Sequence, residues 1–190
     1  RPGPTAQTTC NVAEKFNDVV EMDLVFYMSH AILHMIDRCT RWHAAREVPS
    51  KDTSSLLDAI NDIWVQPHGP PKRLTVDQET ALAKSFQAGS YFSRKGINYD
   101  PRAVHQHARF IERRGELLKG TLRKITSQLK AENIDIPFKH VLAEAVFAGN
   151  ALITVNQTTP YNAVYGRVPN ILPDLNQYDD PQGDKEKGPL

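Results

Sequence analysis

Three acidic residues of this sequence stand where packing alone gives no reason for a charge. Asp23 interrupts the most apolar run of the chain, at 19–27. Asp77 ends a shorter apolar run, and Glu112 lies beside the apolar stripe of a long helical pattern. A carboxylate inside a strand is costly unless a cation or a hydrogen-bond donor offsets its charge. These three acids are therefore the candidates for chemistry.

If the three carboxylates converge in the fold, a divalent cation is the simplest way to offset their mutual repulsion. A ligand set of carboxylate oxygens without Cys or His favours Mg²⁺ or Mn²⁺ over Zn²⁺. Two such ions about 4 Å apart activate an attacking oxygen and stabilise the leaving oxygen of a phosphodiester. Taken singly, each acid is more often a helix cap, an ion-pair partner or a solvated side chain. Both interpretations stay open on composition and spacing.

The elements that would position these acids begin with strand patterns. Tight turns at 28–30 and 38–40 separate three β-rich runs and predict an antiparallel meander. Two further short apolar runs are typical of buried strands. The five predicted strands cover 19–27, 31–37, 41–48, 73–77 and 97–99.

Helical periodicity fills much of the remaining chain. Apolar residues from Leu56 to Trp64 predict a helix with N-cap candidates just before it. The longest pattern, 104–131, places on one face Ile111, Leu118, Leu122, Ile125 and Leu129. Further helices are predicted at 81–88, at 141–152 and from Pro160, which Thr159 would cap. The sequence thus predicts an α/β fold: a mixed five-stranded sheet, with an antiparallel meander plus parallel strands and helices on both faces.

The length of 190 residues and the composition are those of one globular domain. We expect a linker at 1–15, the domain at 16–173 and a disordered acidic tail at 174–190. No apolar run reaches the ~20 residues that cross a bilayer, so no membrane partner is expected. Two cysteines without C-x-x-C spacing predict plain thiols. Arg1 at the first position predicts a piece of something longer, such as a polyprotein.

The net charge of +1 conceals two regions of opposite sign. The tail at 174–190 holds five acids and two lysines, a net of −3. The stretch 94–130 holds ten basic residues and three acids, a net of +7. A basic helix face is often only solvated, but beside a metal–carboxylate site it is better interpreted as a track for nucleic-acid phosphates.

Five segments of the chain resemble the catalytic core of retroviral and retrotransposon integrases, which are ribonuclease-H-like polynucleotidyl transferases. They are 19–24 around Asp23, 36–42, 74–77 ending at Asp77, 110–114 around Glu112, and 156–169. Segment 36–42 is similar to the family's D-x-x-[ST]-[RK] turn, and 110–114 is similar to its G-x-x-E-R helix opening. Segment 156–169 is similar to the specific ending T-x-x-[ST]-P-x-x-x-x-[YF]-G-x-x-P. The resemblance extends over about 16–175.

The resemblance implies a ribonuclease-H-like fold and DNA integration as the function. It implies that Asp23, Asp77 and Glu112 are the catalytic residues and the ligands of two Mg²⁺ (or Mn²⁺) ions. Water would attack the end of the element's DNA in 3′-end processing, and the freed 3′-hydroxyl would attack target DNA in strand transfer. The spacing agrees, because 34 residues separate Asp77 from Glu112, against about 35 in the family.

Basic and histidine side chains near Glu112 are the predicted contacts to DNA. His107 belongs to a His-x-His pair, which we assign to a DNA-contacting loop rather than to half of a zinc site. The family holds DNA ends with two lysines beyond the Glu, and the matching positions here are Glu116 and Lys119. The predicted DNA-binding residues are His107, Arg109, Arg113, Lys119 and Arg123.

The remaining expectations rest on the resemblance only. The implied partners are retroelement DNA ends, target DNA and further copies of this chain in a homodimer or higher homo-oligomer. The helix Leu56–Trp64 and the stripe 118–129 would supply the face for that contact. The implied location is the nucleus of a eukaryotic host, after a stage in a cytoplasmic particle.

Two alternatives stay open. A decayed or domesticated copy that binds DNA or protein without catalysis is favoured by three departures from the family pattern: Arg109 at a loop glycine, Glu79 at the glycine of D-x-G-x-E-F, and Glu116 at a lysine. A ribonuclease H that acts on hybrids is disfavoured by segment 156–169, because that ending belongs to integrases.

Overall fold

The structure is a computed structural model that describes residues 13–77, 81–82, 85–102, 109–155 and 157–171. Within these ranges the side chains of 77, 101–102 and 109–110 are left out of the description. The predicted acidic tail, most of the predicted linker and His107 lie outside the described residues. What the sequence predicts for these residues therefore stays a prediction.

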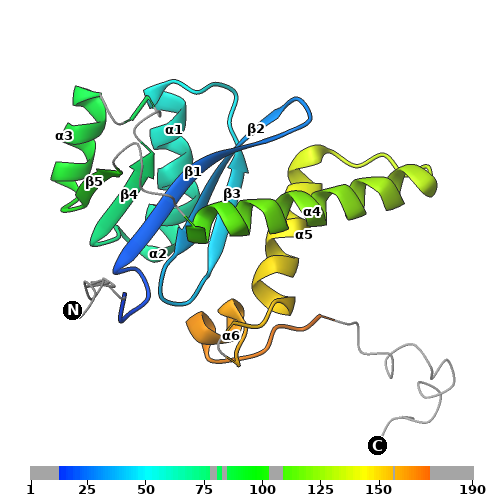
Figure 1. Cartoon of the computed structure of the whole chain (residues 1–190). Helices are drawn as coiled ribbons and strands as arrows, with labels where there is room; N and C mark the ends of the chain where they lie inside the picture. The colour runs from blue at the N-terminus through cyan, green and yellow to red at the C-terminus, as the bar shows by residue number, and fades with distance from the viewer. Residues whose placement is uncertain (1–12, 78–80, 83–84, 103–108, 156, 172–190) are drawn as a thin grey trace, which may run out of the picture.

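A mixed five-stranded sheet forms the centre of the molecule. Its strands are β1 (Val19–Tyr27), β2 (His30–Asp37), β3 (His43–Glu47), β4 (Arg73–Asp77) and β5 (Asn98–Arg102). They lie in the order β3-β2-β1-β4-β5 (Figure 1). Consecutive strands β1, β2 and β3 are antiparallel, whereas β4 runs parallel to β1 and β5 parallel to β4. The predicted fold class is confirmed.

The third strand is shorter than the predicted range 41–48. Arg41 has a positive φ of 66° and belongs to the turn after β2, so the strand begins only at His43. Cys39 in the same turn is a free thiol, as predicted.

Helices cover both faces of the sheet. They are α1 (Thr53–Ile60), the π-helical turn η1 (Asn61–Val65), α2 (Gln66–His68), α3 (Phe86–Arg94), α4 (Arg109–Ala131), α5 (Phe138–Leu152) and α6 (Pro160–Tyr165). The predicted cap Thr159 accepts a hydrogen bond from Asn162 N at the start of α6. The long helix α4 crosses the sheet and extends past it, with α5 packed against it (Figure 1). None of the described helices is long and apolar enough to cross a membrane.

The helix predicted at 81–88 is wrong in its position. Ser85 is the N-cap of α3, because its side chain accepts a hydrogen bond from Ala88 N, and the helix runs from Phe86 to Arg94. Leu82 is fully buried from a turn. Its apolar side chain therefore fills the core without belonging to a helix face.

Two hydrophobic clusters lie on opposite faces of the sheet. Met22 and Leu24 of β1 pack in the first cluster, with residues of α1, η1 and α3. Val25 and Tyr27 pack in the second cluster, with residues of α4 and α5. This alternation follows from the two-residue period of a strand. Positions 23, 25 and 27 therefore face α4.

The apolar faces predicted to join two copies of the chain are used inside it. The apolar side chains from Leu56 to Trp64 lie in the first cluster, and Leu118 and Leu122 are buried in the second. Ile125 and Leu129 pack against that second cluster. These side chains cover the chain's own sheet, and a contact between copies through these helices stays a prediction.

Candidate active site

Asp23 lies in the middle of β1, on the side of the sheet that α4 covers. Its strand neighbours at alternate positions, Val25 and Tyr27, pack with α4 and α5. The carboxylate is half-buried, and its Oδ1 accepts a hydrogen bond of 2.8 Å from Leu24 N. The most apolar strand thus carries its acid toward the helix that bears Glu112.

Asp77 occupies the neighbouring position in the next strand. Met22 of β1 is the register partner of Val76 of β4, and the two strands are parallel. Asp23 and Asp77 are the next residues along each strand. Adjacent strands lie about 4.8 Å apart, so the register brings the backbones of these two residues side by side.

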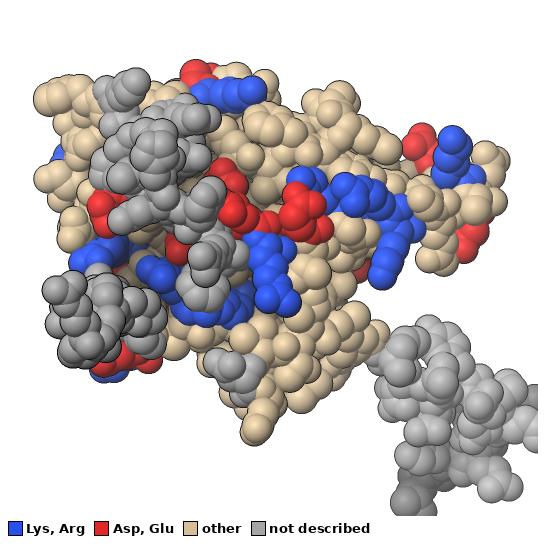
Figure 2. All heavy atoms as spheres, in the orientation of Figure 1, with Lys and Arg blue, Asp and Glu red and all other residues tan. Residues whose placement is uncertain are grey.

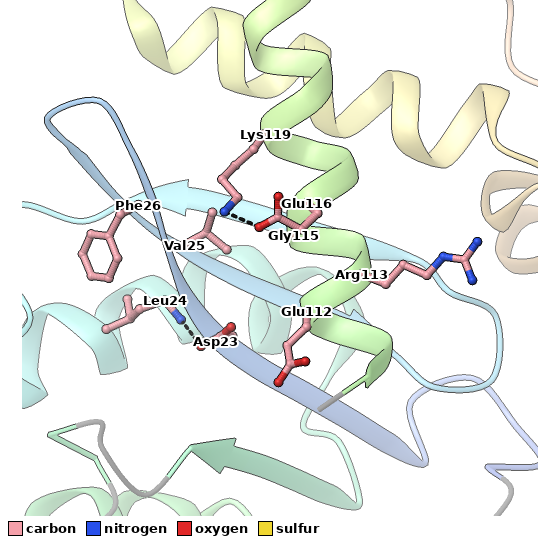
Figure 3. Close-up of a pocket in the computed structure, with 9 residues that line it drawn as sticks. All are labelled: Asp23, Leu24, Val25, Phe26, Glu112, Arg113, Gly115, Glu116 and Lys119. Carbon is pink, nitrogen blue, oxygen red and sulfur yellow. Dashed lines mark hydrogen bonds and ion pairs between the residues drawn. The ribbon is translucent and has the colours of Figure 1, made fainter. Parts of the chain in front are cut away.

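Glu112 lies in the first turn of α4 and is exposed. Gly115, one turn later, lets the helix approach β1 closely: a Cβ at this position would lie 3.2 Å from Val25 Cγ2. Figure 3 shows Glu112 and Asp23 on the same side of the helix, whereas Arg113 points away from them. Two of the three predicted carboxylates are therefore brought together.

These two carboxylates line a cavity of about 600 Å³ between β1 and α4. Its lining residues are Asp23, Leu24, Val25, Phe26, Glu112, Arg113, Gly115, Glu116 and Lys119. In Figure 2, acidic atoms gather near the middle of the face shown, and basic atoms lie beside them along α4. The cavity thus combines a cation-attracting centre with cationic side chains at its edge.

The donor set suits a hard divalent cation. The available ligand atoms are carboxylate oxygens, which Mg²⁺ and Mn²⁺ prefer. Among the described side chains, no three His, Cys, Asp or Glu residues come together as a metal site. The side chain of Asp77, the predicted third ligand, is not among them.

The predicted DNA-binding residues differ in their surroundings. Arg113 lines the cavity, and Arg123 is exposed one turn beyond Lys119. Lys119 forms a hydrogen-bonded ion pair with Glu116 (Figure 3). The hydrogen bond from Lys119 is the main reason why the pKa of Glu116 lies below its usual range. For Arg109 only the backbone is described, at the start of α4. Contact with DNA stays a prediction for each of them.

A buried polar network lies behind α4, and the sequence patterns did not single it out. His34 Nε2 and His43 Nδ1 are 3.0 Å apart in a hydrogen bond between β2 and β3. Asn150 of α5 accepts a bond from His43 N and donates one to His43 O, at 3.0 and 2.8 Å. Arg114 Nη2 donates to Gly149 O at 2.5 Å. The network ties α4 and α5 to the meander.

Burial governs the charges in this network. Burial, and then the charge of Arg114, lowers the pKa of His34 to about 3. Burial and the neighbouring His34 and Arg114 hold the pKa of His43 well below its usual range. Burial, and then the charge of Arg41, lowers the pKa of Arg114 to about 10. At neutral pH both imidazoles are neutral and Arg114 is charged.

One sequence feature points to His34. It alternates with Ile32 and Ile36 along β2, and all three are buried on the face that α4 and α5 cover. A histidine flanked in this way at two-residue spacing is expected to be inside the protein. No comparable pattern marks Arg114, because it lies within a basic helix.

The solved structures that this chain matches include retroviral integrases. A chain of the simian T-cell lymphotropic virus intasome, solved with PP2A regulatory subunit B56 gamma, matches with a TM-score of 0.70 and 18% identity. The match covers 83% of this chain and 56% of that one, so this chain spans little more than half the length of the intasome chain.

Two isolated core domains match over nearly their whole length. The HTLV-2 integrase catalytic core domain in complex with magnesium, in its trimeric form, has a TM-score of 0.67 at 14% identity, covering 77% of this chain and 95% of that one. The BIV integrase catalytic core domain has a TM-score of 0.65 at 15% identity, covering 77% and 92%. No protein-family model and no curated protein sequence matches the chain. The likeness is one of fold: the chain has the fold of a retroviral integrase catalytic core.

Proposed function

We propose that this chain is the catalytic core of an integrase, which processes the 3′ ends of retroelement DNA and joins them to target DNA. The fold is that of retroviral integrase cores. The observation that carries the proposal is that Asp23 and Glu112 line one cavity, with Asp77 at the register position beside Asp23.

Asp23, Asp77 and Glu112 would hold two Mg²⁺ (or Mn²⁺) ions. The HTLV-2 core with the same fold is a magnesium complex, and the carboxylate donor set suits this metal. When bound, the ions would activate the attacking oxygen and stabilise the leaving oxygen of a phosphodiester. The chain itself supplies the geometry: two acids on adjacent paired strands, and one on a helix that Gly115 holds close to them.

The cationic side chains beside the cavity would hold the DNA backbone. Contacts to phosphates position DNA without reading its sequence, so weak target-sequence preference is expected. The proposed contacts are His107, Arg109, Arg113, Lys119 and Arg123. By the same resemblance, the chain would act as a homodimer or higher homo-oligomer in the nucleus of a eukaryotic host.

Rejoining of a branched integration-intermediate DNA in the presence of Mn²⁺ tests the proposal. Wild type is expected to rejoin the strands. Asp77→Asn and Glu112→Gln are expected to lower the rate by more than about 100-fold, since even the outer partners of metal ligands are worth 10- to 100-fold. The measurement is the initial rate of product formation on a denaturing gel.

Two exposed acids outside the cavity provide matched controls. Asp58→Asn on α1 and Glu144→Gln on α5 make the same chemical changes and are expected to keep wild-type rates. Rejoining that survives in both Asp77→Asn and Glu112→Gln would contradict the assignment. A wild type that binds DNA without rejoining it would favour a domain that has lost catalysis.

A further inference from the structure

A second cavity, of about 350 Å³, shares Arg113 with the carboxylate cavity. Arg41 from the turn between β2 and β3 lines it, together with Arg114 and Leu117 of α4 and residues 153–155 after α5. Three of these lining residues are arginines, and none of the described ones is acidic. The cavity is therefore strongly cationic.

Arg114 is the most constrained of the three arginines. Its residue surface is only 4% exposed, and the part of the chain that the structure describes forms no ion pair with it. Its Nη2 donates to Gly149 O, whereas its buried Nε has no hydrogen-bond acceptor among the described residues. A buried charge without a counter-ion is costly. An anion in the adjoining cavity would offset that cost.

Arg41 adds a second cationic side chain to the wall of this cavity. It is half-buried, and its charge is the second cause, after burial, of the lowered pKa of Arg114. The acids that favour the charged form of Arg41 are Glu21 and Asp37, which do not line the cavity. The guanidinium groups of Arg41 and Arg114 thus repel each other beside this cavity.

We propose that this cavity binds a phosphate of the DNA backbone, an inference that rests on the proposed function. Guanidinium groups match the geometry of phosphate oxygens and stay charged when partly buried. The exposed Thr154 supplies a hydroxyl beside them. Because Arg113 lines both cavities, the proposed phosphate site adjoins the carboxylate cavity at which the DNA would be processed.

Substitutions at Thr154 test the site without disturbing a buried group. Binding of a fluorescent DNA duplex to the full chain is measured by anisotropy over a range of NaCl concentrations in metal-free buffer. Thr154→Asp is expected to weaken binding about tenfold and to reduce the salt slope by about one unit, because the added carboxylate repels the phosphate. Arg41→Gln is expected to act in the same direction, with the melting temperature checking that it folds.

Two controls separate position from charge. Thr154→Asn has nearly the same shape as the Asp variant without its charge, and Gln87→Glu makes the same change in net charge on the exposed side of α3. Both are expected to bind DNA within about twofold of wild type. Equal affinity and salt slope for Thr154→Asp and Gln87→Glu would overturn the proposal.

Inorganic phosphate distinguishes a DNA phosphate from a free anion. Phosphate could raise the melting temperature of wild type but not of Thr154→Asp, while Thr154→Asp binds DNA as tightly as wild type. In that case the cavity takes a free anion, and the DNA assignment is overturned. The outcomes also separate the two proposals. A wild type that binds no DNA contradicts the proposed function, whereas normal binding by the variants contradicts only this inference.

Discussion

Glu116 lowers the net positive charge at the edge of the carboxylate cavity. Its ion pair with Lys119 lies at the surface, with 65% of the Glu116 side chain exposed, so it adds little stability. The pair nevertheless neutralises the lysine and places a third acid beside Asp23 and Glu112. Under the proposed function, the pair would therefore affect DNA binding more than folding.

Glu116→Lys is therefore expected to tighten DNA binding. The change frees Lys119 and adds a second cation, so the salt slope of binding should steepen by about one to two units. Fluorescence anisotropy with a DNA duplex over a range of NaCl concentrations measures both quantities. Glu144→Lys on α5 makes the same change in charge away from the cavity. If its slope steepens as much, the effect is one of net charge and not of this site.

At the scale of elements, α5 approaches the meander closely at one residue. A Cβ at Gly149 would overlap the imidazole of His43, which is 1% exposed and bonded to His34. Gly120 of α4 is a helical glycine without such a close neighbour, since a Cβ at this position would have no atom within 4 Å among those compared. A comparison of alanine variants at these two glycines therefore separates the effect of close packing on stability from the effect of helix propensity.

Gly149→Ala is expected to lower the free energy of unfolding by about 1–3 kcal/mol, because the buried ring has no room to move. Gly120→Ala is expected to raise it by about 0.5–1 kcal/mol, because alanine loses less backbone entropy in a helix. Urea unfolding followed by circular dichroism measures both variants. Equal stability of the two would mean that α5 does not depend on this contact.

At the scale of the whole molecule, the buried histidines make stability depend on pH. The ring that accepts in the hydrogen bond between His34 and His43 must be neutral, and burial disfavours the charged form of both rings. Their pKa values in the folded chain lie below the ordinary 6.5, that of His34 at about 3. As the pH falls, the unfolded chain takes up these protons first. The contribution is therefore full above about pH 6.5 and is lost as the pH falls below it.

The free energy of unfolding is expected to drop between pH 7.5 and about pH 5. Below about pH 6.5, each histidine that stays neutral in the folded chain contributes about 1.4 kcal/mol per pH unit to this drop, and above that pH the drop is small. Urea unfolding at a series of pH values measures the slope. The slope should flatten in His34→Gln and stay unchanged in His140→Gln, whose side chain is exposed. A wild-type slope equal to that of His34→Gln would contradict the role of the pair.

Much of the fold could be predicted because its signals are local. The alternation along β1, the turn after β2 and the cap at Thr159 each depend on residues a few positions apart. The helix α3 was misplaced because the apolar Leu82 resembles part of a helix face but is buried from a turn. Of the candidate site, the sequence supplied the identity of the acids, and the register of β1 with β4 and the approach of α4 supplied their proximity.

The sequence by itself determined most of the strands and helices and which acids interrupt the apolar pattern, since periodicity and caps act over a few residues. Only the tertiary structure decided where the apolar faces point, and it packs the apolar side chains of Leu56–Trp64 and 118–129 against the chain's own sheet. It also decided that Arg41 meets Arg114 beside one cavity. Such contacts depend on the path of the chain between distant residues, because non-local packing places charges that no local pattern records.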